Sequence, residues 1–301
     1  MRFLYPRVRV RVNGLEMALT AILFPGQGSQ SRDMRDPVAR VRPDLLSLVQ
    51  ELVGEDPFPR AEEGTNFAQP AIFCASLAGW TAIERRAPRA ERAVGDLMAG
   101  HSLGEFGALV AAGCLSERDG LRLVVLRGRL MQEAGERAGD GGMLALLGAG
   151  AAGHADALAE AHGLAVANDN SPQQIVLSGS RAALPAAAAA AEELGLRSMQ
   201  LPVTGAFHSP MMEGAVPEFA AALDQVELRE PRVAVLSAVT AQPFDDVRLR
   251  LAEGLTRPVR WRETMLELHR RGAERFVEVG PGRVLTGLAK RTLKDVELVS
   301  A

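Results

Sequence analysis

The 301-residue sequence has few cysteines and no large excess of either charge. Cys74 and Cys114 are the only two cysteines, and neither lies in a CxxC pair or in a cluster with histidine. This spacing excludes a disulfide framework and argues against a metal site, so we expect two reduced core thiols and no bound metal. A formal net charge of −3 lacks the basic excess that a nucleic-acid-binding surface requires.

Long apolar runs are also missing. No stretch of about 18 apolar residues, the length that a membrane-spanning helix needs, is free of charge, and no secretory signal is visible. We therefore expect a cytoplasmic protein that does not enter a membrane. With 47% hydrophobic and 24% charged residues, its ligands are expected to be small molecules or another protein.

The first 17 residues differ in composition from the rest of the chain. Four arginines precede the first acidic residue, Glu16, and Met17 stands directly before a strand-like apolar run. A basic arm that binds nucleic acid is one interpretation of this pattern. We favour the other, that residues 1–17 are a disordered or non-native extension, produced by an upstream start codon or added for expression.

The remaining sequence alternates short apolar runs with helix-like segments, which predicts an α/β protein. Residues 18–140 and 208–301 are expected to form one large α/β subdomain that is discontinuous in sequence. Residues 141–207 follow the order β-α-β-β-α-β, which is that of a ferredoxin-like unit and predicts an inserted small subdomain. Its expected strands are 143–147, 164–167, 174–178 and 197–203, and its expected helices are 151–161 and 181–194.

A glycine-rich segment suggests a nucleotide site. Residues 148–153 read GAGAAG, a literal GxGxxG between a predicted strand and a predicted helix, with Asp169 placed where a ribose-binding acid could lie. Against this interpretation, Asp169 lies in NDNSP, whose residues favour a hairpin turn that returns the chain antiparallel. A chain rich in alanine and glycine also produces such matches by chance, so no nucleotide site is predicted.

A more specific signal is AGHSLGEFGALVAAG at residues 99–113. Ser102 lies between Gly100 and Gly104 in the pattern Gly-x-Ser-x-Gly, after a predicted strand and before a predicted helix. This is the context of a nucleophile elbow, a strained turn that exposes a serine hydroxyl above a sheet. A serine in an ordinary glycine turn is the alternative.

A nucleophilic serine needs a base within hydrogen-bond reach. Of the five histidines, His208 in GAFHSPMM is the best placed, because it follows the last strand of the small subdomain, where the chain returns to the large one. A cleft between the subdomains would bring it opposite Ser102, although spacing alone fits a structural histidine equally well. Packing or surface roles are expected for the other four: His101, His154, His162 and His269.

In chain order, seven segments resemble the malonyl-CoA:acyl carrier protein transacylases, including the discrete acyltransferases that serve fatty-acid and polyketide synthases. The resemblance covers nearly the whole chain after Met17. It implies a hydrolase-like α/β core that carries a ferredoxin-like insert, in agreement with the order of elements. The segments are FPGQGSQ at 24–30, TNFAQPA at 65–71, AGHSLGEF at 99–106, LRGRLMQE at 126–133, NSPQQIVLSG at 170–179, GAFHSPMM at 205–212 and VEVGPGRVLTGLAKR at 277–291.

The resemblance implies an acyl-serine enzyme. At the matching positions, Ser102 would be the nucleophile and His208 its general base and acid, and the backbone N–H groups of Gln27 and Leu103 would form the oxyanion hole. Arg127 would bind the distal carboxylate of malonyl through two parallel hydrogen bonds. The implied reaction is ping-pong malonyl transfer from malonyl-CoA to the phosphopantetheine thiol of an acyl carrier protein, by a monomer that needs no metal or redox cofactor.

Finer specificity also follows from the resemblance. Leu103 and Phe207 favour malonyl over branched extenders, and a phenyl ring beside the acyl pocket leaves little room for an α-substituent. The segment RPVRW puts Arg260 where a glutamine is common, at a position expected to lie by the substrate, and this variant resembles discrete polyketide acyltransferases. An asparagine often found in the preceding segment is missing from VLSAVTAQ at 235–242.

Two other functions are considered. A hydrolase would pass the acyl group from Ser102 to water, but a hydrolase of non-carboxylated chains has no use for Arg127. A non-catalytic docking module would not need the complete set of matched residues. An acidic carrier protein would require a local basic patch, and a solvated face is an equally good interpretation of each candidate cation: Arg270, Arg271, Arg275, Arg283, Lys290 and Arg291.

Overall fold

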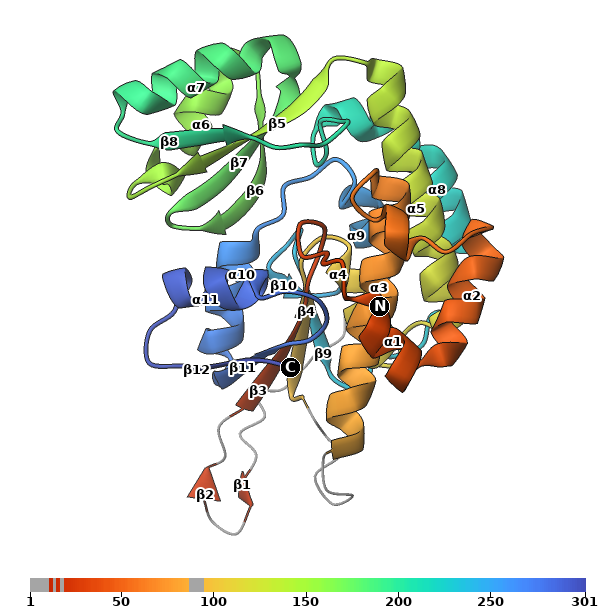
Figure 1. Cartoon of the computed structure of the whole chain (residues 1–301). Helices are drawn as coiled ribbons and strands as arrows, with labels where there is room; N and C mark the ends of the chain where they lie inside the picture. The colour runs from red at the N-terminus through yellow and green to blue at the C-terminus, as the bar shows by residue number, and fades with distance from the viewer. Residues whose placement is uncertain (1–10, 13–14, 17–18, 87–94) are drawn as a thin grey trace.

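The computed structural model describes residues 11–12, 15–16, 19–86 and 95–301. Its centre is a six-stranded sheet in the order β10-β9-β4-β3-β11-β12 (Figure 1). Neighbouring strands are parallel except β10, which pairs antiparallel with β9 at one edge. The strands are β3 (Leu19–Phe24), β4 (Leu97–Gly100), β9 (Ala234–Ser237), β10 (Gln242–Pro243), β11 (Ala273–Glu278) and β12 (Glu297–Ser300).

Helices cover both faces of this sheet, so its central strands are buried on both sides (Figure 1). Alternate residues of β3 enter different cores: Ile22 and Phe24 pack towards α3 and α5, whereas Ala21 and Leu23 pack towards α10 and α11. The helical elements of the large subdomain are α1 (Arg35–Val41), α2 (Pro43–Val53), η1 (Phe58–Arg60), α3 (Thr65–Arg86), α4 (Gly104–Ala111), α5 (Glu117–Ala138), η4 (Pro210–Ala215), α8 (Val216–Asp224), α9 (Val247–Glu253), α10 (Trp261–Arg270) and α11 (Val284–Thr292).

A small subdomain is inserted after α5 and lies above the large sheet in Figure 1. Its four strands form an antiparallel sheet in the order β6-β7-β5-β8. Two helices cover one face, while Met143, Ala145 and Val176 on the other face join the core of the large subdomain. The elements are β5 (Gly141–Leu147), α6 (Ala151–His162), β6 (Ala165–Ser171), β7 (Gln174–Ser180), η3 (Arg181–Ala183), α7 (Leu184–Glu193) and β8 (Arg197–Gln200).

The predicted antiparallel hairpin is present between β6 and β7, but Asp169 lies in β6 and not in the turn, so that part of the expectation is wrong. Strand β6 runs on to Ser171, and the turn is made by residues 172 and 173. Tertiary pairing overrides the local turn preference: the Asp169 N–H donates to the Val259 carbonyl, and the Val259 N–H donates to the Ala167 carbonyl, both at 2.9 Å. The Asp169 carboxylate is held by Arg262 at 2.7 Å. This backbone pairing ties the small subdomain to the segment before α10.

Two further expectations concern the ends of elements. Strand β8 ends at Gln200 instead of continuing to residue 203, where Pro202 cannot donate to the sheet. Most of the segment 1–17 lies outside the described residues; its described part is a two-residue antiparallel pair, β1 (Arg11–Val12) with β2 (Leu15–Glu16). Among the described residues, no helix is both long enough and apolar enough to cross a membrane.

Candidate active site

Ser102 occupies a sharp turn between β4 and α4. Its φ is +52°, in the left-handed region that costs a non-glycine residue about 1–3 kcal/mol. Glycines on both sides make this turn possible. A Cβ on Gly100 would lie 1.9 Å from the carbonyl carbon of Gly104, and a Cβ on Gly104 would lie 2.0 Å from the Phe24 carbonyl oxygen. The turn therefore has the strained geometry of a nucleophile elbow.

His208 faces this serine from a loop 106 residues further along the chain. Its Nε2 lies 2.9 Å from the Ser102 Oγ, and its Nδ1 lies 2.9 Å from the Gly254 carbonyl oxygen. Because a carbonyl only accepts, Nδ1 carries the proton and Nε2 is free to accept one from the serine. His208 also has a positive φ, +57°, so both residues of the pair adopt a conformation that is unfavourable for their type.

The electrostatic environment keeps His208 neutral. Burial, followed by the positive charge of Arg127, lowers the pKa of His208 to about 3. A neutral imidazole is the form that can take a proton from the hydroxyl group. The geometry and the charge state together make Ser102 and His208 capable of nucleophilic catalysis.

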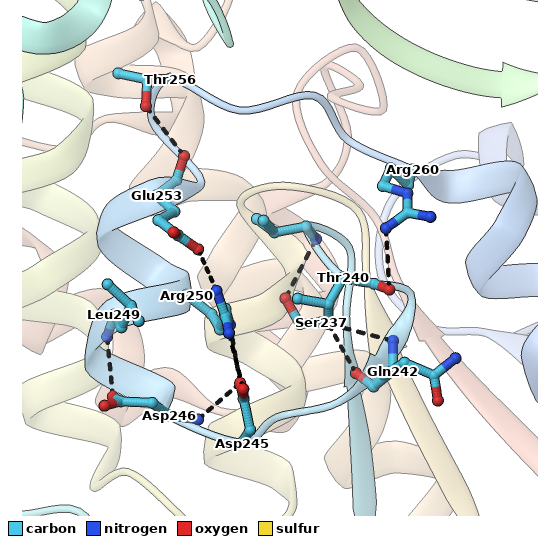
Figure 2. A network of polar contacts seen from close by, with 11 residues as sticks. Ser237, Thr240, Gln242, Asp245, Asp246, Leu249, Arg250, Glu253, Thr256 and Arg260 are labelled. Atoms are coloured by element: carbon cyan, nitrogen blue, oxygen red, sulfur yellow. Dashed lines mark hydrogen bonds and ion pairs between the residues drawn. The ribbon is translucent and has the colours of Figure 1, made fainter.

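The Gly254 carbonyl that orients His208 comes directly after α9. Asp246 caps the N-terminus of the helix, and its side chain accepts from the Leu249 N–H at 3.0 Å. Arg250 binds Asp245 at 2.8 Å and Glu253 at 2.7 Å, as Figure 2 shows, and its carbonyl accepts from the Gly254 N–H at 2.9 Å. Ion pairs therefore hold the segment that supplies the histidine's partner.

Arg127 lies in the middle of α5 and is 2% exposed. Its Nη2 donates to the Ser102 Oγ at 3.0 Å, and its Nη1 donates to the Gln69 side-chain oxygen at 2.9 Å. Burial lowers the pKa of Arg127 to about 10, which leaves it protonated at neutral pH. The neighbouring helix arginines, Arg122 and Arg129, are exposed, so Arg127 is the cation of this helix that faces the serine.

The two predicted oxyanion-hole residues lie beside the serine. Gln27 and Leu103 both line the cavity around Ser102. Neither backbone N–H donates a hydrogen bond to any part of the chain that the structure describes, so both are available to an added oxygen. The side chain of Gln27 is fixed by the Thr65 hydroxyl at 3.1 Å. Thr65 belongs to the segment TNFAQPA at residues 65–71.

The cavity has a volume of about 490 Å³, within the range of small-ligand sites. Its floor contains Ser102, Arg127 and His208 from the large subdomain. The opposite wall is the open face of the small sheet, with Met143, Ala145, Leu147, Val176 and Met199. Phe207 is buried and also lines the cavity. The site therefore combines a polar floor with an apolar channel between the subdomains.

His101, next to the nucleophile, links the two subdomains. Its Nε2 lies 2.7 Å from the Asn170 side-chain oxygen on β6, and its ring packs edge-on against Trp261 with centroids 5.4 Å apart. Its side chain therefore supports the turn from the side, as expected of a packing residue. His269 is exposed on α10, also as expected.

The structure places Arg260 away from the cavity. Its guanidinium pairs with Glu263 and donates to the Thr240 carbonyl at 3.2 Å, a contact drawn in Figure 2, and it does not line the cavity. A contact of Arg260 with substrate therefore stays a prediction. Its side chain follows the first turn of α10, where Glu263 is the nearest acid. The segment that lacks the asparagine contains Ala238, whose backbone N–H donates to Glu105 at 2.8 Å.

The candidate docking cations do not all remain free. Arg270 and Arg271 both bind Glu267, and Arg275 pairs with Glu297 at 3.5 Å. Arg291 lines the mouth of the cavity and donates to Gln174 at 3.2 Å.

Within the described residues, no group of three or more His, Cys, Asp or Glu side chains could hold a metal ion.

The chain is similar to known acyl transferases along most of its length. A family model described as the acyl transferase domain matches residues 46–301. The polyketide biosynthesis protein ThaF of Burkholderia thailandensis is 40% identical over 290 residues, which are 92% of this chain but 24% of ThaF, so the chain spans about a quarter of that protein. The malonyl CoA-acyl carrier protein transacylase of Haemophilus influenzae is 35% identical over 297 residues, 93% of this chain and 94% of the relative.

Solved structures agree over the same range. An acyl carrier protein S-malonyltransferase from Vibrio cholerae matches with a TM-score of 0.85 at 34% identity, covering 94% of this chain and 97% of that one. The malonyl-transacylase in PlMCAT:AntF, a complex with a type II polyketide synthase acyl-carrier protein, matches with a TM-score of 0.83 at 32% identity, covering 94% and 95%. The predicted α/β fold class is confirmed.

Proposed function

The chain belongs to the acyl transferase family, and we propose that it transfers a malonyl group from malonyl-CoA to the phosphopantetheine thiol of an acyl carrier protein. The observation that carries this proposal is Arg127, a buried cation whose Nη2 lies 3.0 Å from the Ser102 hydroxyl and whose direct partners are neutral. A guanidinium binds a carboxylate with two parallel hydrogen bonds, so this position selects an acyl group that ends in a carboxylate.

The first half-reaction forms a malonyl-serine ester. The Ser102 oxygen attacks the thioester carbonyl while His208 Nε2 takes the hydroxyl proton, and the N–H groups of Gln27 and Leu103 stabilise the oxyanion. The C–S bond then breaks, and His208 returns its proton to the CoA sulfur. In the second half-reaction, the phosphopantetheine thiol gives its proton to His208 and attacks the ester. Ser102 leaves as the hydroxyl.

Substrate binding also prepares the base. The malonyl carboxylate takes the Arg127 N–H that points at the Ser102 oxygen in the free protein, which frees a lone pair of that oxygen for attack while its hydroxyl donates to His208. It also neutralises the positive charge that lowers the pKa of His208. His208 therefore becomes a stronger base when malonyl is bound, which couples recognition of the carboxylate to the chemical step.

Further properties belong to the same proposal. The reaction needs no metal or redox cofactor, because an acyl group passes from sulfur to oxygen to sulfur without a change in oxidation state. One chain supplies the whole proposed set, which suits a monomer. Cys74 and Cys114 are both buried and form no disulfide, which suits the reducing cytoplasm. The buried side chains of Leu103 and Phe207 favour malonyl over bulkier extenders.

Related enzymes indicate the type of acceptor. Relatives at 35–40% identity include a malonyl CoA-acyl carrier protein transacylase and a polyketide biosynthesis protein, and one structural neighbour is bound to an acyl-carrier protein. The acceptor proposed here is a carrier protein of fatty-acid or polyketide assembly. Transfer rates to a panel of holo carrier proteins from both kinds of pathway would identify it.

Intact-mass measurement tests the proposal directly. On incubation with malonyl-CoA, the wild-type protein should gain the mass of one malonyl group and lose it again when holo acyl carrier protein is added. Ser102→Ala should gain none. Rapid release of free malonate, with no acylated protein and no acylated carrier, would instead show a hydrolase. Equal malonyl transfer by Ser102→Ala would refute the mechanism.

A further inference from the structure

Arg127 is held by an amide where a carboxylate would also fit. Its Nη1 donates to the Gln69 side-chain oxygen at 2.9 Å, and Gln69 is 1% exposed. The charge of Glu105 raises the pKa of Arg127 through space, but the Glu105 carboxylate accepts its hydrogen bond from the Ala238 N–H. The guanidinium is thus oriented by a neutral dipole and keeps its full charge.

Chemistry fixes which way the Gln69 amide points. Arginine has only donors, so the amide oxygen must face Arg127, and the amide nitrogen faces the Met131 sulfur at 3.4 Å. Met131 lies four residues after Arg127 on α5, one turn further along the same face. The amide therefore spans two successive turns of α5 and leaves no choice of orientation.

Close packing of two helices makes this contact possible. Gly128 follows Arg127, and a Cβ there would lie 3.0 Å from the Thr65 carbonyl oxygen and 3.5 Å from the Gln69 Cβ. Any larger residue would push α5 away from α3 and draw Gln69 back from the guanidinium. The motif TNFAQPA thus supplies Thr65 for the Gln27 loop and Gln69 for the arginine.

We propose that Gln69 is a positioning residue that determines selectivity for carboxylated acyl groups, because it orients Arg127 without neutralising it. This inference rests on the proposed function, in which Arg127 binds the malonyl carboxylate. A carboxylate at the same place would form an internal ion pair with the buried guanidinium and leave the substrate without a free cation. A neutral amide keeps that charge for the substrate.

The isosteric change Gln69→Glu tests the proposal. It should lower kcat/KM for malonyl-CoA by about 10- to 100-fold, the range expected when a charged hydrogen bond is lost, with most of the change in KM. Self-acylation from acetyl-CoA, which has no carboxylate, should change much less, so the malonyl-to-acetyl ratio should fall. Gln225→Glu, which adds the same charge at an exposed position, should leave both rates unchanged.

Two further variants separate positioning from folding. Gln69→Met removes the acceptor without adding charge, and it should also lower the malonyl-to-acetyl ratio, whereas a purely structural role would lower both rates equally. In the double variant with Arg127→Ala, the Gln69→Glu change should have little further effect on malonyl transfer, because both act on the same charge. Additive losses would overturn the inference.

Failure of the inference differs from failure of the proposed function. If wild-type protein is not acylated by malonyl-CoA, the proposed function fails. If wild-type protein is acylated but Gln69→Glu and Gln69→Met both keep its malonyl-to-acetyl ratio, the role of Gln69 fails and the function stands.

Discussion

Two arginines act on the same histidine in opposite ways. Arg250 is saturated: it binds the carboxylates of Asp245 and Glu253, and it fixes the end of α9, next to the carbonyl that holds His208. Arg127 is buried against an amide and a hydroxyl, and its uncompensated charge lowers the pKa of His208. The difference shows how one residue type serves either to hold the backbone or to receive a ligand, depending on its partners.

Removing the unsaturated charge should have the largest effect. Arg127→Ala deletes the proposed carboxylate partner, and truncating one member of a buried, hydrogen-bonded charge pair costs about 2–5 kcal/mol. We therefore expect kcat/KM for malonyl-CoA to fall by about 30-fold or more, measured by transfer to a holo carrier protein. Acylation by acetyl-CoA should fall far less. Equal losses for the two substrates would contradict the role of Arg127 in recognition.

Removing the saturated charge should have a smaller effect of a different kind. Arg250→Met breaks two partly exposed ion pairs, each worth up to about 1 kcal/mol, and loosens the segment that carries Gly254. We expect kcat to fall roughly 2- to 5-fold, with KM for malonyl-CoA unchanged. Arg229→Met, which breaks a surface pair with Glu227, is the matched control and should leave kcat unchanged. A change in KM alone would argue against the link through Gly254.

Glu105 is a buried carboxyl group near Arg127 that forms no hydrogen bond with the guanidinium. Burial raises the pKa of Glu105 to about 7. Since the folded protein favours the protonated form, stability is lost as pH rises from the unfolded pKa near 4.5 through about 7. Glu105→Gln avoids this loss. We expect the Tm difference, variant minus wild type, to become more positive by about 2 °C or more between pH 5 and pH 8. A constant difference would show that Glu105 does not titrate there.

The pH dependence of kcat/KM for malonyl-CoA is expected to be flat near and below neutral pH. With the pKa of His208 lowered to about 3, the free protein already holds the base in its neutral form throughout the usual assay range. The value of kcat/KM for malonyl-CoA should therefore stay level from about pH 8 down to pH 5.5. The release of CoA, measured at each pH, checks this. A decline with a midpoint near the ordinary histidine value of about 6.5 would contradict this environment.

Local signals in the sequence were sufficient for part of the site. Gly100 and Gly104 around Ser102 predict the elbow, because the turn physically requires glycine on both sides. His208 and Arg127 came from ordered motifs along the chain, and their roles as base and carboxylate partner stay predictions. The α/β class followed from the alternation of elements.

Other features depend on contacts that sequence patterns do not encode. The partner of His208 is the backbone carbonyl of Gly254, and any residue type supplies a carbonyl. Gln69 meets Arg127 through the packing of α3 on α5, 58 residues apart in sequence. Arg260 was placed by analogy with a glutamine, but its longer side chain pairs with Glu263 instead. Asp169 lies among residues that favour a turn, but it pairs with Ile175 of β7 and donates to the Val259 carbonyl, so it belongs to a strand.

The pairing of Val259 with β6 has a mechanical consequence. Val259 bonds to the small subdomain through both its N–H and its carbonyl, and the carbonyl of Gly254, five residues earlier, accepts from His208 Nδ1. A shift of the insert that moved β6 would therefore also move the segment that orients the imidazole, without passing through the central sheet. A change in the width of the channel between the subdomains would therefore be accompanied by a change in the orientation of His208.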